Sequence, residues 1–296
     1  MDIESKKFLG QPKNFVSIFN ALLFDGKQVL KPEYLKDENS ELVMNVSSKH
    51  VDIIKRYEDG TYLDLFVIES QSYVDPSMVA RVMEYESVAR MRYIRQNFKK
   101  HVPMHTRLPM ILTVVLYVGE SKWNAAKRLS ELEIIHPGFE DIFNEFKLNL
   151  IELNTNHKYN TGEKATQDFF DLLRMIYRKQ ILKEDLDREF NRDALYFAYV
   201  VTKNKELLNI YQKSEKGDVK VCRALDEMFE ESTNKGIQMG IKQGIEQGIE
   251  QGIEQGSEKK ELEMYRKMMD KGFEIKTIAS IFSVSEESIK KLLMKA

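Results

Sequence analysis

The segment that most constrains the fold is residues 110–118, MILTVVLYV, in which both alternating sets of positions are apolar. Successive side chains of a β-strand point to opposite faces, so a strand that is apolar at both sets must be covered on both sides. The chain therefore needs a buried strand with one layer above it and another below. Its 296 residues are enough for such a core, as one large domain or two smaller ones.

Two further β-type runs, residues 50–56 and 62–70, lie before this strand. Asp59-Gly60 separates them, and Asp-Gly between two strands predicts a hairpin. A helix is predicted over residues 76–97, because Asp75 suits an N-cap and Pro76 a first helical position. The remaining expected elements of this half are a helix at residues 13–26 and a strand at residues 147–153. This order of elements predicts an α/β core over residues 1–155.

The rest of the chain is expected to be helical, with a helical region at residues 156–235. Residues 236–257 repeat Gly-Ile-Xaa-Gln, and each glycine inside a helix costs about 1 kcal/mol relative to alanine. Two interpretations stay open for this repeat. It is either a semi-flexible linker or a self-association helix in which glycine allows backbones to approach closely.

Residues 258–296 are predicted to form three short helices with helix-turn-helix spacing. The second helix of the motif would begin with Glu286-Glu287, and acids there face DNA phosphates unfavourably. DNA contact and a helical dimerisation cap are therefore both open for this segment. Its expected core residues are Ile275, Ile278, Ala279, Phe282, Val284, Ile289 and Leu292.

Bulk properties exclude several classes of protein. The net charge of −2 gives no overall basic character, and a single cysteine, Cys222, rules out a disulfide within the chain. The longest apolar run, residues 108–118, is too short to span a bilayer, and the first ten residues have no apolar signal core. We expect a cytoplasmic protein without a membrane partner.

A candidate site lies where the strand at residues 62–70 ends. Glu69 and Gln71 are two residues apart, so both side chains would point to the same face of the sheet. If Asp59-Gly60 is a two-residue turn, the numbers of paired residues add up to 119, which places Asp52 opposite Val67 and diagonal to Glu69. Two close carboxylates repel each other unless a cation lies between them. Mg²⁺ or another divalent cation fits such a pair, binding phosphate oxygens and activating water.

A basic segment follows the candidate site. No acidic residue occurs between Ser87 and Gly119. The basic residues of this segment that are assigned to nucleic-acid binding are Arg90, Arg92, Arg95, Lys99 and Lys100. They predict a phosphate-binding surface, unless acids from elsewhere in the fold neutralise them. Arg81 and Tyr85, one turn apart, would steady either a phosphate or the Glu69 carboxylate, and a purely structural role also stays open.

Several stretches together carry a family resemblance: FNALLFDGK at residues 19–27, IESQSYVD at 68–75, RVMEY at 81–85, LYVGE at 116–120 and the Gly-Ile-Xaa-Gln repeat. With Asp52 followed by Glu69-Ser70-Gln71, the chain resembles the Rpn family of recombination-promoting nucleases, proteins that are also called transposases. This family is a branch of the PD-(D/E)XK nuclease superfamily.

The resemblance implies a restriction-endonuclease-like mixed sheet with flanking helices and a metal-dependent DNA endonuclease linked to recombination or mobile elements. Asp52 and Glu69 would be the catalytic metal ligands, with the Ser70 carbonyl as a third. Gln71 stands where the superfamily more often has lysine, and it can only orient water or phosphate by hydrogen bonds. Asn20 stands where a further acid is often found, so none is assigned there.

The implied partners are DNA and a second copy bound through the C-terminal helices. The alternative function is a catalytically inactive DNA-binding or oligomeric scaffold protein derived from a nuclease.

Overall fold

The computed structural model describes residues 3–38, 53–60, 63–181, 185–214 and 217–294. The chain divides into two compact units, Met1–Phe229 and Glu230–Ala296. The predicted boundaries at residues 155, 235 and 257 stay predictions. Among the described residues, no helix has both the length and the apolar character needed to cross a membrane.

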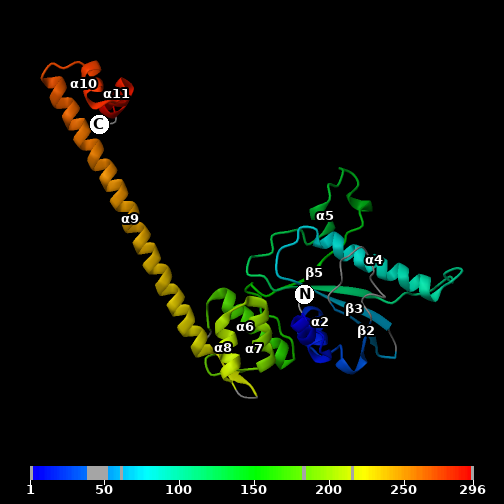
Figure 1. Cartoon of the computed structure of the whole chain (residues 1–296). Helices are drawn as coiled ribbons and strands as arrows, with labels where there is room; N and C mark the ends of the chain where they lie inside the picture. Colours follow the sequence, from blue (N-terminus) through cyan, green and yellow to red (C-terminus); the bar gives the residue numbers. More distant parts are fainter. Residues whose placement is uncertain (1–2, 39–52, 61–62, 182–184, 215–216, 295–296) are drawn as a thin grey trace. The chain divides into compact units, whose positions relative to one another are not determined.

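The first unit is built on a five-stranded mixed sheet in the order β1-β2-β3-β4-β5 (Figure 1). The two pairings among β1, β2 and β3 are antiparallel, whereas β3 with β4 and β4 with β5 are parallel. The strands are β1 (Leu35–Asp37), β2 (Ile53–Glu58), β3 (Leu63–Gln71), β4 (Ile111–Tyr117) and β5 (Asn149–Glu152). This confirms the predicted α/β fold. The strand β4 is covered on both faces, as its sequence requires. Of the described strands of this sheet, only the three-residue β1 was not predicted.

The predicted register of the hairpin is wrong by two residues. Val67 pairs with Ile54 rather than with Asp52, and the last pair before the connection is Glu58 with Leu63. Asp59-Gly60 is therefore part of a longer connection than the two-residue turn that this dipeptide favours. A shift of two keeps every side chain on its predicted face, because strand side chains alternate with period two. Asp52 itself lies outside the described residues.

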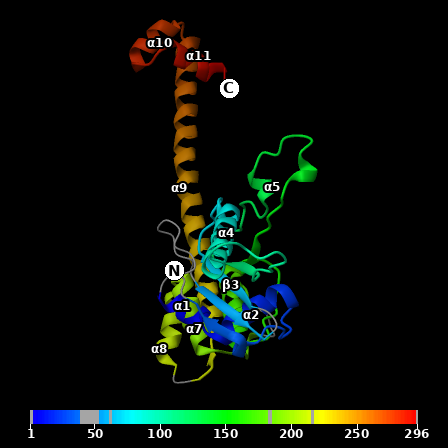
Figure 2. The same ribbon diagram turned by 90° about the vertical axis from the view of Figure 1, so that its right-hand side faces the viewer.

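Helix α4 (Met78–Asn97) covers one face of the sheet (Figures 1 and 2). Leu65 and Val67 of β3 pack there against Tyr85 and Ala89 of α4. The odd-numbered residues of β3 therefore point towards α4, which fixes the side to which its last residues point.

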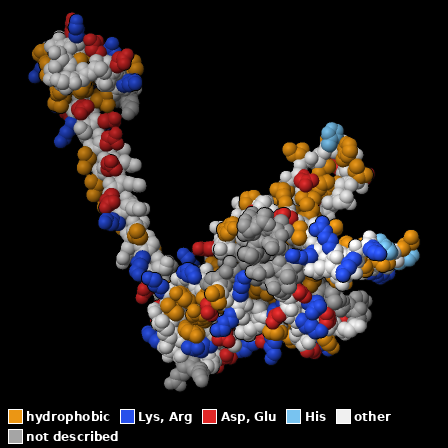
Figure 3. Space-filling view, turned by 45° about the vertical axis from the view of Figure 1, so that its right-hand side comes forward, with side chains coloured by type: hydrophobic (Ala, Val, Ile, Leu, Met, Phe, Trp, Pro, Cys, Tyr) orange, Lys and Arg blue, Asp and Glu red, His pale blue; other side chains and the backbone are white. Residues whose placement is uncertain are grey.

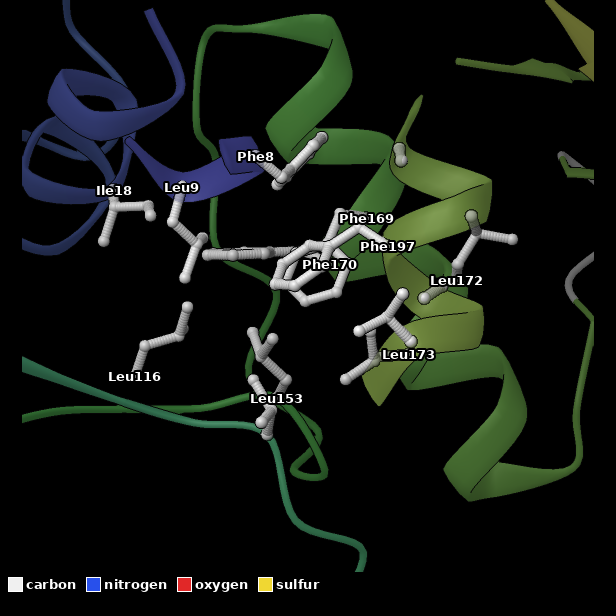
Figure 4. Close-up of a cluster of buried hydrophobic side chains, with 14 of the residues drawn as sticks. Phe8, Leu9, Ile18, Leu116, Leu153, Phe169, Phe170, Leu172, Leu173 and Phe197 are labelled. Atoms are coloured by element: carbon white, nitrogen blue, oxygen red, sulfur yellow. The ribbon is translucent and has the colours of Figure 1, made fainter. Parts of the chain in front are cut away.

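The opposite face of the sheet shares a large hydrophobic cluster with residues of several helices, among them α1 (Ile3–Leu9), α2 (Pro12–Phe24), α6 (Lys164–Arg178) and α7 (Arg192–Thr202). Phe66 of β3 lies against Phe19 of α2, with their ring centroids 4.8 Å apart. Figure 4 shows side chains from distant parts of the sequence meeting in one cluster, with Phe8 beside Phe169 and Phe197 and with Leu9 in the same cluster. The region after residue 156 thus shares its core with the sheet.

Shorter elements complete the first unit. They are α5 (Leu129–Leu132), α8 (Lys205–Lys213), two 3-10 turns at Pro32–Tyr34 and Glu140–Ile142, and the paired strands β6 (Glu189–Phe190) and β7 (Val219–Lys220). The two-residue strands β6 and β7 were not expected in a region predicted to be helical. Such short strands carry no alternation for a sequence pattern to detect.

The repeat is α-helical, and it lies within α9 (Cys222–Asp270). Its isoleucines are exposed, from 55% at Ile237 to 69% at Ile253. Apart from the adjoining residues and backbone of the helix itself, no described atom lies within 4 Å of where a Cβ would stand on Gly240 or Gly248. Figure 3 shows hydrophobic and acidic side chains along the length of this helix.

After α9 come α10 (Ile275–Phe282) and α11 (Glu286–Met294). Ile278, Ala279 and Ile289 are buried together with Tyr265 of α9, as predicted for the first three. The prediction that Val284 belongs to this core is wrong, because 38% of its surface is exposed. Val284 directly follows Ser283, which ends α10 in the left-handed conformation (φ 55°).

Candidate functional site

Glu69 is the buried acid of the sheet, with 2% of its surface exposed. It lies near the C-terminal end of β3 on the face that α4 covers, beside Val115 of β4. Gln71 is buried on the same face, and its Nε2 donates a hydrogen bond of 2.9 Å to Glu69 Oε1. The prediction that the two side chains share a face is confirmed.

Arg81, in the first turn of α4, neutralises this acid. Its Nη2 lies 3.0 Å from Glu69 Oε1, and its Nη1 lies 2.5 Å from Asp75 Oδ2. The Tyr85 hydroxyl accepts from the same guanidinium, 2.8 Å from Nη2 and 3.1 Å from Nε. We call Glu69, Gln71, Asp75, Arg81 and Tyr85 the strand-end cluster.

The cluster forms because a strand end and a helix start are joined by a short connection. Asp75 Oδ1 accepts hydrogen bonds from the backbone N–H and the hydroxyl of Ser77, which holds the first turn of α4. The other oxygen of Asp75 is then directed at Arg81, one turn into the helix. Residues i and i+4 of a helix lie on the same side, so Tyr85 stands next to Arg81.

The ionisation of the cluster follows from burial and these contacts. Burial alone would raise the pKa of Asp75, but hydrogen bonds from Ser77 and Arg81 outweigh it and hold that pKa below its usual range. Burial alone would also lower the pKa of Arg81, but hydrogen bonds with Asp75 and Tyr85 outweigh it and raise that pKa. Asp75 therefore stabilises the fold above its unfolded pKa of about 3.9, and this contribution is lost as the pH falls through its lower folded value.

Ser70 and Asp52, the other two predicted metal ligands, differ in what the structure describes. Ser70 lies in β3 between Glu69 and Gln71 and pairs with Leu116, whose side chain belongs to the core on the opposite face. Asp52 lies outside the described residues. Asn20 has a structural role, because its side-chain amide both donates to and accepts from the backbone of Leu30, at 2.9 Å in each case.

The basic segment spreads over the second half of α4 and the chain that follows it. Arg90 is neutralised by Glu86, whose Oε2 lies 2.8 Å from Arg90 Nη2 and whose Oε1 accepts from the Thr113 N–H at 3.1 Å. Glu86 stands one residue before the acid-free window, so counting inside that window missed the pair. Arg95, Lys99 and Lys100 are exposed and Arg92 is half-buried.

These basic residues lie at a distance from the strand-end cluster. Fourteen helical positions separate Arg81 from Arg95, which corresponds to about 21 Å along α4. Arg81 and Tyr85 lie beside Glu69, whereas the predicted DNA-binding residues that follow in the sequence lie towards or beyond the C-terminal end of α4.

Sequence reasoning missed the part that Asp75 plays. It was expected only to cap α4, and the local signal, Asp-Pro-Ser, is one of helix initiation. Trp123, in the loop after β4, is buried, and its ring lies edge-to-face with that of Tyr117, with the centroids 5.2 Å apart.

The family model described as "Putative transposase, YhgA-like" matches residues 6–207, well over half of the chain. The chain belongs to this family. The YhgA-like match contains the whole sheet and every residue of the strand-end cluster, and it ends before the repeat of α9. No curated protein and no solved structure matches the chain.

The chemistry of the described donors suits a hard cation, because Glu69 offers carboxylate oxygens and Ser70 a backbone carbonyl. Over the residues that the structure describes, however, no three or more His, Cys, Asp or Glu side chains form a group that could hold a metal ion. A cation at Glu69 would share this carboxylate with the Arg81 guanidinium. The second acid of the expected pair, Asp52, falls outside the described part.

Removing the Arg81 guanidinium should destabilise the folded protein. Arg81→Ala leaves the buried Glu69 and the half-buried Asp75 without their shared counter-charge, and loss of one partner of a buried ion pair costs about 3–5 kcal/mol. The free energy of unfolding, measured with urea at pH 7, should fall by about that amount. Adding Glu69→Gln to the Arg81→Ala variant should restore part of the loss.

The matched control is Arg223→Ala, which breaks the exposed ion pair with Glu227. Exposed pairs contribute at most about 1 kcal/mol, so this change should be nearly neutral. Equal effects of the two arginine substitutions would contradict the account of the strand-end cluster.

Proposed function

We propose that the protein is a metal-dependent endonuclease that hydrolyses DNA phosphodiester bonds. The observation that carries the proposal is the buried Glu69 carboxylate at a strand end, held in one orientation by Gln71 and Arg81. A buried acid with fixed partners is costly to maintain, and such groups concentrate at functional sites. Membership of a transposase family supports a general nuclease-like role on mobile DNA.

In this proposal Asp52 and Glu69 bind Mg²⁺ or another divalent cation, with the Ser70 carbonyl as a third ligand. The bound cation would supply a Lewis acid for the phosphate and lower the pKa of a water molecule. Asp52 itself lies outside the described part of the chain, so its part in this site stays a proposal.

Gln71 and Arg81 would not bind the metal ion. They would orient the Glu69 carboxylate, a water molecule or a phosphate beside it. Gln71 already donates to Glu69 and would orient the carboxylate, or a water molecule beside it, without carrying charge. Arg81 offsets the charge of Glu69 before DNA and the cation bind. Its guanidinium is also near enough to the carboxylate to contact a phosphate bound there, a role that suits its fork of donors.

The exposed cations Arg95, Lys99 and Lys100, with Arg92, would bind the phosphate backbone away from the reacting bond. Phosphate contacts of this kind position DNA without reading its sequence. Arg90 contributes less to this surface, because Glu86 already neutralises it. A cytoplasmic location stays a prediction.

One observation favours a second candidate function, a catalytically inactive DNA-binding or scaffold protein. The Arg81–Glu69 ion pair balances the charge of the acid without a metal ion. Glu69 would then be a structural acid, and its contacts with Arg81 would join β3 to α4.

Plasmid nicking by the purified chain distinguishes the two functions. We expect nicking with Mg²⁺, none with EDTA, and a loss of at least about 100-fold in rate for Glu69→Gln and for Asp52→Ala, since each removes a ligand of the catalytic cation. Glu84→Gln is the matched control, because Glu84 is an exposed acid on α4 and its substitution removes the same charge.

The control should nick at the wild-type rate. Absence of nicking by the wild type with Mg²⁺, Mn²⁺ and Ca²⁺ on supercoiled, linear and single-stranded DNA would favour the inactive scaffold.

We also propose that the protein self-associates through α9. The support is a helix that exposes an isoleucine in each repeat beside glycines that leave its surface open. A period of four residues exceeds the 3.6 of the α-helix, so the stripe turns by about 40° per repeat and two copies would cross with a right-handed twist. Glu286 and Glu287 at the start of α11 would repel DNA phosphates, which disfavours DNA contact by this segment. In this proposal α10 and α11 therefore form a helical dimerisation cap.

Sedimentation equilibrium tests this proposal. The wild type should sediment as an oligomer at micromolar concentration, and Ile245→Gln with Ile249→Gln should reduce it to monomer, because the exposed apolar stripe is interrupted. Gln247→Ala with Gln251→Ala, the matched pair beside the stripe, should leave the mass unchanged. A monomeric wild type across this concentration range would contradict self-association.

A further inference from the structure

A groove lies between the second half of α4 and the edge formed by β1, β2 and β3. Its volume is about 310 Å³, at the lower end of the range of small-molecule sites. We call it the α4 groove. It is lined by Glu38, Arg56, Leu65, Ala89, Arg92, Tyr93, Gln96 and Asn97.

The groove and the strand-end cluster share one face of the sheet. Leu65 and Glu69 are four residues apart in β3, so both point towards α4 and lie about 13 Å apart along the strand. Arg56 pairs with Leu65 across the hairpin and lies on the same face. A chain of nucleotides bound over α4 could therefore reach both places.

The lining combines groups that suit a flat, polar-edged ligand. Leu65 and Ala89 form a buried apolar floor, 7% and 1% exposed. Tyr93 adds an aromatic ring, and Arg56 and Arg92 add guanidinium planes, surfaces on which nucleobases stack.

The charge of the lining argues against a bare phosphate. Glu38 lies in the groove and pairs with Arg56, with Nε and Oε2 3.5 Å apart. A carboxylate repels phosphate, but it accepts hydrogen bonds from the amino group of a base. Gln96 and Asn97 add amides that can both donate and accept.

We propose that the α4 groove binds an unpaired nucleobase of single-stranded DNA, with the base stacked on Tyr93. In a duplex the faces of the bases are covered by their neighbours and only their edges are accessible, so a stacking groove selects unpaired nucleotides. The inference rests on the proposed function in taking DNA as the ligand, and it adds that the substrate has a single-stranded segment next to the bond that is cut.

Binding measured in EDTA, where no cleavage occurs, tests the inference separately from catalysis. The probe is a 12-nucleotide single strand carrying one 2-aminopurine and an end label, compared by anisotropy with the duplex of the same sequence. We expect the full chain to bind the single strand more tightly and to quench the 2-aminopurine.

Tyr93→Ala should weaken single-strand binding about 5- to 150-fold, the equivalent of about 1–3 kcal/mol for one stacked base, and should abolish the quenching. Tyr93→Leu keeps apolar volume on α4 and should show the same loss, which separates stacking from folding. Tyr93→Phe should bind like the wild type. Arg223→Ala, which removes an exposed positive charge elsewhere, is the control for charge alone.

Wild-type affinity and quenching in both Tyr93→Ala and Tyr93→Leu would overturn the inference, and nicking by the same variants would leave the proposed function intact. Competition by free dCMP at the concentration that suffices for the single strand would also overturn it, because the groove would then bind nucleotides rather than a DNA chain. Tyr93-dependent binding without nicking under any condition would support the groove and reject the endonuclease.

Discussion

The ion pair between Arg81 and Glu69 is the contact on which the site depends. A carboxylate with 2% exposure needs a compensating charge, and Arg81 provides it from a neighbouring element. Because the same guanidinium also binds Asp75 and Tyr85, the end of β3, the connection to α4 and the first two turns of α4 are fixed to one another. The position of the acid and the stability of this region thus rest on the same contacts.

This arrangement accounts for two properties that seem opposed. A buried acid that is already paired is stable, and a catalytic acid must still be able to take a cation. Arg81 can serve both needs, because Glu69 accepts from only one of the five N–H donors of the guanidinium, while Asp75 and Tyr85 hold the group in place. In the proposed enzyme the phosphate of DNA would take over part of the guanidinium as the cation binds the acid. In the same proposal the Gln71 amide, which carries no charge, would keep its hydrogen bond to Glu69.

The sequence allowed the sheet and the shared face of Glu69 and Gln71 to be predicted, because both follow from the alternation of side chains along a strand. Residues 110–118 required cover on both faces, and β4 has it from α4 on one side and from the large hydrophobic cluster that includes α1, α2 and α6 on the other. The hairpin register could not be predicted. Asp59-Gly60 favours a two-residue turn, whereas the observed pairing of Ile54 with Val67 requires a longer connection. The role of Asp75 was also missed, because its contact with Arg81 forms only once the connection and the helix have folded together. The i,i+4 pair of Glu86 with Arg90 was missed because Glu86 lies just outside the acid-free window. The α4 groove draws residues from four separate segments, and no local pattern marks it.

Binding of Mg²⁺ to the folded chain tests the central claim, that Glu69 is a functional acid rather than a structural one. A ligand that binds only the folded state raises its stability, by about 2.7 kcal/mol at 100 times its dissociation constant. Thermal unfolding should therefore shift upwards and saturate as Mg²⁺ is added to the wild type, and it should not shift for Glu69→Gln. Equal shifts in the two proteins, or none in either, would contradict the claim and leave Glu69 as the partner that Arg81 needs to hold β3 against α4.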